Sequence, residues 1–305
     1  MGLISQTMSS HPEFSSIRAT EHGSATVRFW GVRGSIPVPG PQTVSYGGNT
    51  SCVEVRAEGQ ILILDAGTGL RGLGDSLAEE FRGRPLSLTM LITHTHSDHI
   101  QGFPFFAPAY EASNHIRILG FSEGGWGLTK AFARQMYSAY FPVGLSHMRG
   151  DMVFEELAGD AFQIGNIRVS TCRTSHPGAC GAYRMDTGAG SICYIPDHEA
   201  DGNPAPERAA VEKLIQGADL VIHDSQYTAE EYRGHEGWGH SSMEQAVRIA
   251  CAARVKCLSL FHHDPSHSDE FLDRMLEQAR HLAAGSETRI EAAREGGQIT
   301  LAGSA

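Results

Sequence analysis

The segment THTHSDHIQG, residues 93–102, constrains this 305-residue chain more than any other feature. It follows LSLTMLI, a continuous apolar run that is typical of a buried strand. His94 and His96 are two residues apart, so both side chains leave an extended backbone on the same side. Asp98 and His99 follow where the chain turns into a helix. A set of solvated loop histidines is the alternative, but four ligand-type side chains at the end of a buried strand predict a metal site.

Other ligand-type side chains stand at the C-terminal ends of further apolar runs. Asp65 ends QILIL, His176 follows NIRVSTCRTS, Asp197 ends SICYIP and His262 ends KCLSLF. A site built along one edge of a sheet would bring all of them together. Individually each has an ordinary structural explanation, such as capping a turn or opening a loop. We expect them to meet because they share the same end of their strands.

Residues 25–305 are expected to form one large α/β domain with two sheets, because strand-like runs come in hairpin order first and then alternate with helices. The runs are 25–30, 51–57, 60–65, 86–93, 115–121, 166–172, 191–197, 219–224, 256–263 and 298–302. Helices are predicted over 241–253, where Ser242 and Gln245 fit a capping box, and over 268–282. Residues 1–24 have the composition of a polar, mobile tail.

Composition narrows the class of protein. Lys and Arg number 24 against 35 Asp and Glu, and the resulting charge of −11 argues against a broad nucleic-acid surface. Six cysteines without a CxxC motif are too few for a disulfide scaffold, so a cytoplasmic protein is expected. No apolar run is long enough for a transmembrane helix, so no membrane partner is expected.

These motifs resemble the metallo-β-lactamase superfamily, whose signature is HxHxDH followed by a His, an Asp and a His. The resemblance implies a four-layer αββα sandwich with a dinuclear metal centre between its sheets. It implies one ion on His94, His96 and His176, a second ion on Asp98, His99 and His262, and Asp197 as the bridge. Asp65 would orient the HxHxDH loop. Histidines suit zinc, our first choice, while the carboxylates also permit manganese or iron.

His262 and His263 both end the same strand, so either is a candidate ligand. The family pattern places the ligand directly after the apolar end of the strand, which favours His262. His263 is then expected to point toward solvent or toward Asp264.

Two further segments, VIHDSQY at 221–227 and GWGHSS at 237–242, resemble the ribonuclease Z branch of phosphodiesterases. In that branch an acidic residue orients a histidine that contacts the scissile phosphate. The matching pair is Asp224 and His240, although this chain has Asp where Glu is usual. The alternative is that His240 is merely an exposed neighbour of a capped helix. With Asp98, this pair completes the candidate catalytic residues.

The resemblance therefore implies a dinuclear-metal hydrolase, and we expect a phosphodiesterase for a small cyclic phosphodiester. Transfer-RNA 3′ processing usually accompanies a long arm inserted before the bridging Asp, but His176 and Asp197 are only 21 positions apart, which argues against long RNA. The alternatives are a lactone, thioester or β-lactam hydrolase with the same centre, and a sensing protein that binds a ligand without turnover. A homodimer is compatible with every alternative.

Two groups of residues are left without a settled role. Arg33, Ser35 and Asn49 lie in a Gly-rich loop that lines the pocket or only makes turns. The aromatic residues between 100 and 145 wall a pocket, or they belong to the core or a dimer contact: Phe103, Phe105, Phe106, Trp126, Tyr137, Tyr140 and Phe141.

Overall fold

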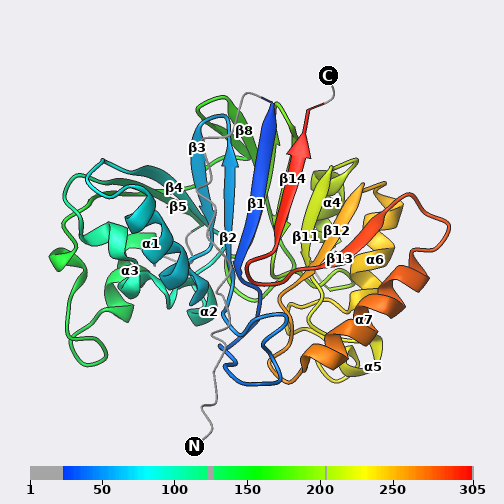
Figure 1. Cartoon of the computed structure of the whole chain (residues 1–305). Coiled ribbons are helices and arrows are strands. Elements are labelled where there is room, and N and C mark those ends of the chain that lie inside the picture. Colours follow the sequence, from blue (N-terminus) through cyan, green and yellow to red (C-terminus); the bar gives the residue numbers. More distant parts are fainter. Residues whose placement is uncertain (1–22, 122–126, 203–204, 304–305) are drawn as a thin grey trace, which may run out of the picture.

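Two seven-stranded sheets pack face to face in the computed structural model (Figure 1). The model describes residues 23–121, 127–202 and 205–303. The first sheet has the order β14-β1-β2-β3-β4-β5-β6. Its strands are β1 (Ser24–Gly31), β2 (Cys52–Ala57), β3 (Gln60–Leu64), β4 (Ser87–Ile92), β5 (His115–Gly120), β6 (Asp151–Glu156) and β14 (Gln298–Ala302). The predicted mobile tail falls outside the described residues except at its end, where Ser24 already begins β1.

The second sheet has the order β13-β12-β11-β10-β9-β8-β7. Its strands are β7 (Ala161–Ile164), β8 (Ile167–Arg173), β9 (Gly181–Thr187), β10 (Gly190–Ile195), β11 (Leu220–Asp224), β12 (Cys257–Phe261) and β13 (Arg289–Ala292). Strands β9 and β10 form a tight antiparallel hairpin that closes between Thr187 and Gly190. The chain between His176 and Asp197 is therefore filled by this hairpin.

Three apolar clusters hold four layers together. The central cluster joins the facing sides of the two sheets, with Val27, Leu64, Val169 and Ile222 among its members. Helices α1 (Gly69–Glu80) and α3 (Leu128–Gln135) pack on the outer side of the first sheet. Helices α4 (Ala205–Ile215), α6 (Met243–Ala252) and α7 (Asp269–Leu282) cover the second. The predicted αββα sandwich is confirmed. In the part of the chain that the structure describes, no helix is long and apolar enough to span a membrane.

Both predicted helices are present. Ser242 caps α6 and shares a capping box with Gln245, as expected, and Ser268 caps α7. The sequence reading missed β6, β7, β9 and β13 and helices α1, α3 and α4. The edge strand β6 reads DMVFEE, which has no clear apolar period, and α1 carries three glycines, which disfavour a helix.

Parallel pairing places the site. Strand β3 runs parallel to β4, and β10, β11 and β12 run parallel to one another. The C-terminal ends of parallel strands open onto one edge of a sheet, where ligand sites form. The side chains that follow these ends are Asp65, His94, Asp197, Asp224 and His262.

Candidate metal centre

Asp197 lies in the middle of a cluster of histidines, directly after β10. Its Oδ1 is 3.0 Å from Nε2 of His99 and 3.4 Å from Nε2 of His262. Its Oδ2 is 3.3 Å from Nε2 of His176 and 3.7 Å from Nε2 of His94. Each carboxylate oxygen thus faces a different pair of ring nitrogens, which is the geometry that a bridging ligand requires.

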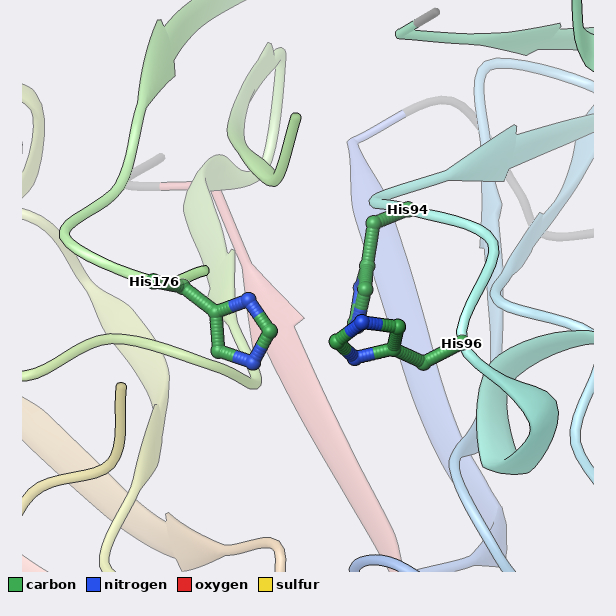
Figure 2. A group of neighbouring side chains, drawn as sticks. All are labelled: His94, His96 and His176. Carbon is green, nitrogen blue, oxygen red and sulfur yellow. The ribbon is translucent and has the colours of Figure 1, made fainter. Parts of the chain in front are cut away.

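The first group of side chains around Asp197 is His94, His96 and His176, whose ligand atoms lie within 4.8 Å of one another. Figure 2 shows the three rings converging, with His94 and His96 on one loop and His176 opposite them. His94 and His96 follow β4 of the first sheet, whereas His176 follows β8 of the second. The site therefore spans the gap between the two sheets.

The second group is Asp98, His99 and His262, again within 4.8 Å of one another. Oδ2 of Asp98 is 3.3 Å from Nε2 of His99 and 3.2 Å from Nε2 of His262. Asp98 and His99 lie in α2 (Ser97–Ile100), a single turn after the HxH segment. The backbone N–H of Ser35 donates to the same Oδ2 over 2.8 Å. All three side chains are buried.

Asp65 holds the HxHxDH loop, as the sequence led us to expect. Its Oδ2 accepts hydrogen bonds from Nδ1 of His99 at 2.8 Å and from the hydroxyl of Tyr194 at 3.0 Å, while the N–H of Thr93 donates to Oδ1 at 2.7 Å. Since Nδ1 of His99 donates to the carboxylate, Nε2 is the ring nitrogen that faces Asp197. Asp65 itself has a φ of +57°, a conformation that a non-glycine residue adopts only where its surroundings enforce it.

His262 is fixed differently. Its Nδ1 donates to Oε1 of Gln226 at 3.0 Å, and Nε2 of Gln226 donates in turn to Asp264 at 3.1 Å. His262 has a φ of +61°. The backbone of Gly34 lies so close that an added Cβ would be 2.5 Å from the imidazole ring, so only glycine fits there.

His263 lies outside the cluster. Its Nε2 donates to the carbonyl of Ala293 at 2.9 Å, and its ring packs edge-on against Tyr46. Burial lowers the pKa of His263 to about 3, so the ring is neutral. The expectation that it would point toward solvent or Asp264 is wrong, because its side chain fills space beneath β13 and the loop after β1.

Asp224 and His240 form the pair that the sequence suggested. Nδ1 of His240 donates to Oδ2 of Asp224 at 2.8 Å, and the N–H groups of His198 and Gln226 also donate to this carboxylate. Burial disfavours the charged imidazole, but Asp224, Asp197 and Asp98 outweigh it and raise the pKa of His240 to about 9. His240 also lies near ligand-type atoms of His176, Asp197 and His262. His99 and His262 turn Nε2 toward Asp197, whereas the nitrogen of His240 that lies 4.0 Å from Asp197 is Nδ1, which already donates to Asp224, so we regard His240 as a neighbour of the candidate metal ligands rather than one of them.

The chemistry of this cluster fits divalent ions. Nε2 of His94, Nε2 of His99 and Oδ1 of Asp197 are buried and have no hydrogen-bond partner among the described residues. Such atoms are rare in folded proteins unless something else engages them. Burial lowers the pKa of His176 to about 4, so its ring is neutral at pH 7 and offers a lone pair. At His99, burial lowers the pKa, but the carboxylates of Asp197, Asp98 and Asp65 outweigh this effect and raise it. This position therefore favours a positive charge.

The Gly-rich loop after β1 contributes less than its composition suggested. Arg33 is fully buried and donates to the carbonyls of Gly47, Asp264 and His267. Asn49 is bound to Glu295. Both residues are structural, and only Ser35 reaches the cluster, through its backbone.

The aromatic residues after the HxHxDH motif divide between core and surface. Phe103 and Phe106 are buried under α1 and α3, so they wall no pocket. Phe105, Tyr137 and Tyr140 are exposed, and Phe141 packs against Phe105. Trp126 lies outside the described residues.

Three comparisons bear on this arrangement. A family model described as a beta-lactamase superfamily domain matches residues 60–263. Ribonuclease Z of Bacillus cereus (strain B4264) is 24% identical over 297 residues, covering 80% of this chain and 92% of that protein. The solved metallo-beta-lactamase fold protein YhfI from Bacillus subtilis matches with a TM-score of 0.66 and 19% identity, over 91% of this chain and 99% of that one. Human tRNase Z, short form (ELAC1), gives 0.62 and 20%, over 90% and 98%.

Proposed function

The chain belongs to the beta-lactamase superfamily, as its histidine motifs predicted, and we propose that it is a phosphodiesterase that uses two divalent ions to hydrolyse a small cyclic phosphodiester. The expected hydrolase class is supported by this family match and by the similarity to ribonuclease Z. The observation that carries the proposal is the Asp224–His240 pair beside Asp197, since it adds a proton donor to the ligand cluster.

In this proposal His94, His96 and His176 hold one ion, Asp98, His99 and His262 hold the other, and Asp197 contacts both. Divalent ions held there would supply a nucleophilic water at neutral pH and positive charge beside the phosphoryl oxygens. Zinc is the first choice because most of the ligand atoms are imidazole nitrogens, and manganese or iron is the alternative.

His240 is proposed to protonate the leaving oxygen. Nδ1 donates to Asp224, so Nε2 is the nitrogen that is left to face a substrate. Asp224 stabilises the charged imidazole and fixes its orientation, which is the role of the acidic partner in proton-transfer pairs. The shorter Asp side chain still reaches, because the two atoms are 2.8 Å apart.

A small substrate is favoured over RNA by the β9–β10 hairpin. It occupies the chain between His176 and Asp197, where an arm for transfer RNA is expected, and the net charge of −11 disfavours a long polyanion. Processing of RNA is the second candidate, because ribonuclease Z proteins resemble 80% of the chain. Cytoplasmic location and a homodimer remain predictions.

The test is a substrate panel on protein reconstituted with zinc or manganese: a 2′,3′-cyclic nucleotide, bis(p-nitrophenyl) phosphate, a transfer-RNA precursor, a lactone and a β-lactam. We expect turnover of the first two to exceed that of the others. Faster cleavage of the precursor would favour the RNA candidate, and faster lactone or β-lactam hydrolysis would favour acyl chemistry. Ligand binding without turnover of any substrate would favour the sensing alternative.

A matched variant tests the catalytic pair. His240→Ala should keep both ions and lose roughly 10²–10⁴ in kcat on a substrate with an alkoxide leaving group. The loss should be smaller with p-nitrophenolate, which leaves without a proton. Asp224→Ala should follow the same pattern more weakly, and the double variant should be non-additive. Unchanged kcat of His240→Ala on the alkoxide substrate would refute the assigned role.

A further inference from the structure

Trp238 is a large aromatic side chain left in solvent close to the candidate metal centre. It is 59% exposed, although large aromatic rings are normally buried. It lies in GWGHSS, two residues before His240. Single exposed aromatic residues are common, so the exposure alone carries no conclusion. Its anchoring and its position are what distinguish it.

The backbone on both sides of Trp238 is fixed. The buried carboxylate of Glu199 accepts hydrogen bonds from the N–H of Gly237 at 2.8 Å and of Gly239 at 3.2 Å, and from the hydroxyl of Tyr232 at 2.6 Å. Both glycines have positive φ, +83° and +90°, which disfavours other residues. The fold thus holds an exposed tryptophan in one place, and such preorganisation reduces the entropic cost of binding.

This position lies beside the cluster. Gly239 packs so closely on His176 that an added Cβ would be 2.5 Å from the ring. A series of ring contacts also leads inward: Trp238 meets His235 at 4.7 Å, His235 stacks on Tyr227 at 4.5 Å, and Tyr227 lies 6.1 Å from His240. Trp238 is therefore connected to the catalytic pair through both its backbone and its ring.

A second exposed apolar side chain belongs to the opposite group of ligands. Ile36 is 58% exposed and follows Ser35, whose N–H binds Asp98. In two places, the loop after β1 and the loop before α6, an exposed apolar side chain thus stands next in sequence to a residue that touches the cluster. A phosphate alone has no flat or apolar part that would use them.

We propose that Trp238 stacks on the nucleobase of the substrate, so that the enzyme acts on small nucleoside phosphodiesters such as 2′,3′-cyclic nucleotides. This inference rests on the proposed phosphodiesterase function. The base lies on the indole while the phosphate reaches the cluster, and Ile36 supplies further apolar contact. Stacking between a base and an aromatic side chain is tolerant of sequence, so purine and pyrimidine nucleotides are both accepted.

The test compares 2′,3′-cyclic AMP with ribose 2,3-cyclic phosphate, which lacks the base. Trp238→Ala should lower kcat/KM for the nucleotide roughly 5- to 150-fold, mainly through KM, and leave the base-free substrate unchanged. Trp238→Phe should restore part of the loss, and Tyr140→Ala, at a distant exposed aromatic, should have no effect. Equal losses on both substrates, or no loss on the nucleotide, would overturn the proposal.

A binding measurement separates this proposal from the catalytic one. Adenosine monophosphate should quench the tryptophan fluorescence of the metal-loaded protein, and Trp238→Phe should abolish that component. If no phosphodiester is hydrolysed but quenching is retained, the catalytic proposal fails and base stacking stands. If phosphodiesters are hydrolysed but the quenching is the same in Trp238→Phe, the stacking proposal fails alone.

Discussion

The two groups of candidate metal ligands on either side of Asp197 differ in how firmly their imidazole rings are held. In the group of Asp98, His99 and His262, each ring has a side-chain partner on Nδ1, the Asp65 carboxylate for His99 and the Gln226 amide for His262. In the group of His94, His96 and His176, Nδ1 of His94 meets the hydroxyl of Thr93 at 3.1 Å, but His96 is exposed, and the buried Nδ1 of His176 has no hydrogen-bond partner among the described residues. We call the group of Asp98, His99 and His262 the braced half, because both of its rings are held, and the other group the open half, because His96 is exposed.

This difference predicts separate roles for the ions in the two halves. A partner on the second ring nitrogen orients a histidine and increases its basicity, which tightens metal binding. We therefore expect the braced half to retain its ion more strongly. The open half contains the exposed His96 and also His176, on which Gly239 beside Trp238 packs, so its ion is expected to exchange more readily and to meet the substrate.

The largest effect is expected at Asp197, the carboxylate that lies between the two groups. Asp197→Ala should reduce the metal content from about two ions per chain to fewer than one and abolish hydrolysis, because both groups lose a ligand. Metal content is measured by elemental analysis of protein dialysed against buffer that contains zinc. Asp201→Ala, at a surface carboxylate paired with Arg248, is the control and should retain both ions. Two ions retained in Asp197→Ala would contradict the bridging role.

The HxHxDH loop could be predicted because its four ligand-type residues lie within six positions and their spacing reveals their direction. His176, Asp197 and His262 are dispersed, and only their places at strand ends and the family resemblance linked them. The bracing could not be predicted in this way. Gln226 reaches His262 across 36 positions, and Tyr194 reaches Asp65 across 129, so only the completed fold brings them together.

Two residues, Arg33 and Glu199, have roles that the sequence around them could not predict. For Arg33 the sequence left two possibilities open, that its Gly-rich loop lines the pocket or that it only makes turns. The Arg33 side chain is buried, where the carbonyls of three distant loop residues accept its guanidinium hydrogen bonds. Glu199 received no role from the sequence, yet it anchors the segment that carries Trp238 and His240.

The second prediction tests which of two neighbouring histidines, His262 or His263, belongs to the braced half. His262→Ala should remove one ion and most turnover, while His263→Ala should keep both ions, because its ring bonds to Ala293 and packs on Tyr46. His263→Ala should instead lower the free energy of unfolding by roughly 1–3 kcal/mol through the lost hydrogen bond and ring contact. Elemental analysis and urea unfolding of the two apo-proteins measure these effects. The reverse ranking in metal content would show that the ligand assignment is off by one residue.

The smallest expected effect compares Asp65 and Gln226, the two side chains that hold the rings of the braced half. Asp65→Asn should weaken binding of its ion toward the upper end of the roughly 10- to 100-fold range known for such partners, because a carboxylate polarises His99 more than an amide can. Gln226→Leu should weaken ion binding by an amount at the lower end of that range, since it removes a neutral hydrogen-bond acceptor from His262. Gln226→Glu gives His262 a carboxylate partner but also places that carboxylate beside Asp264, which now accepts from Nε2 of Gln226, so we expect it to bind the ion no more tightly than the parent protein does. Competition with a chromophoric chelator measures all three affinities. The bracing argument would be falsified if Asp65→Asn and Gln226→Leu left the affinity of both ions unchanged, because metal retention would then depend on the direct ligands alone.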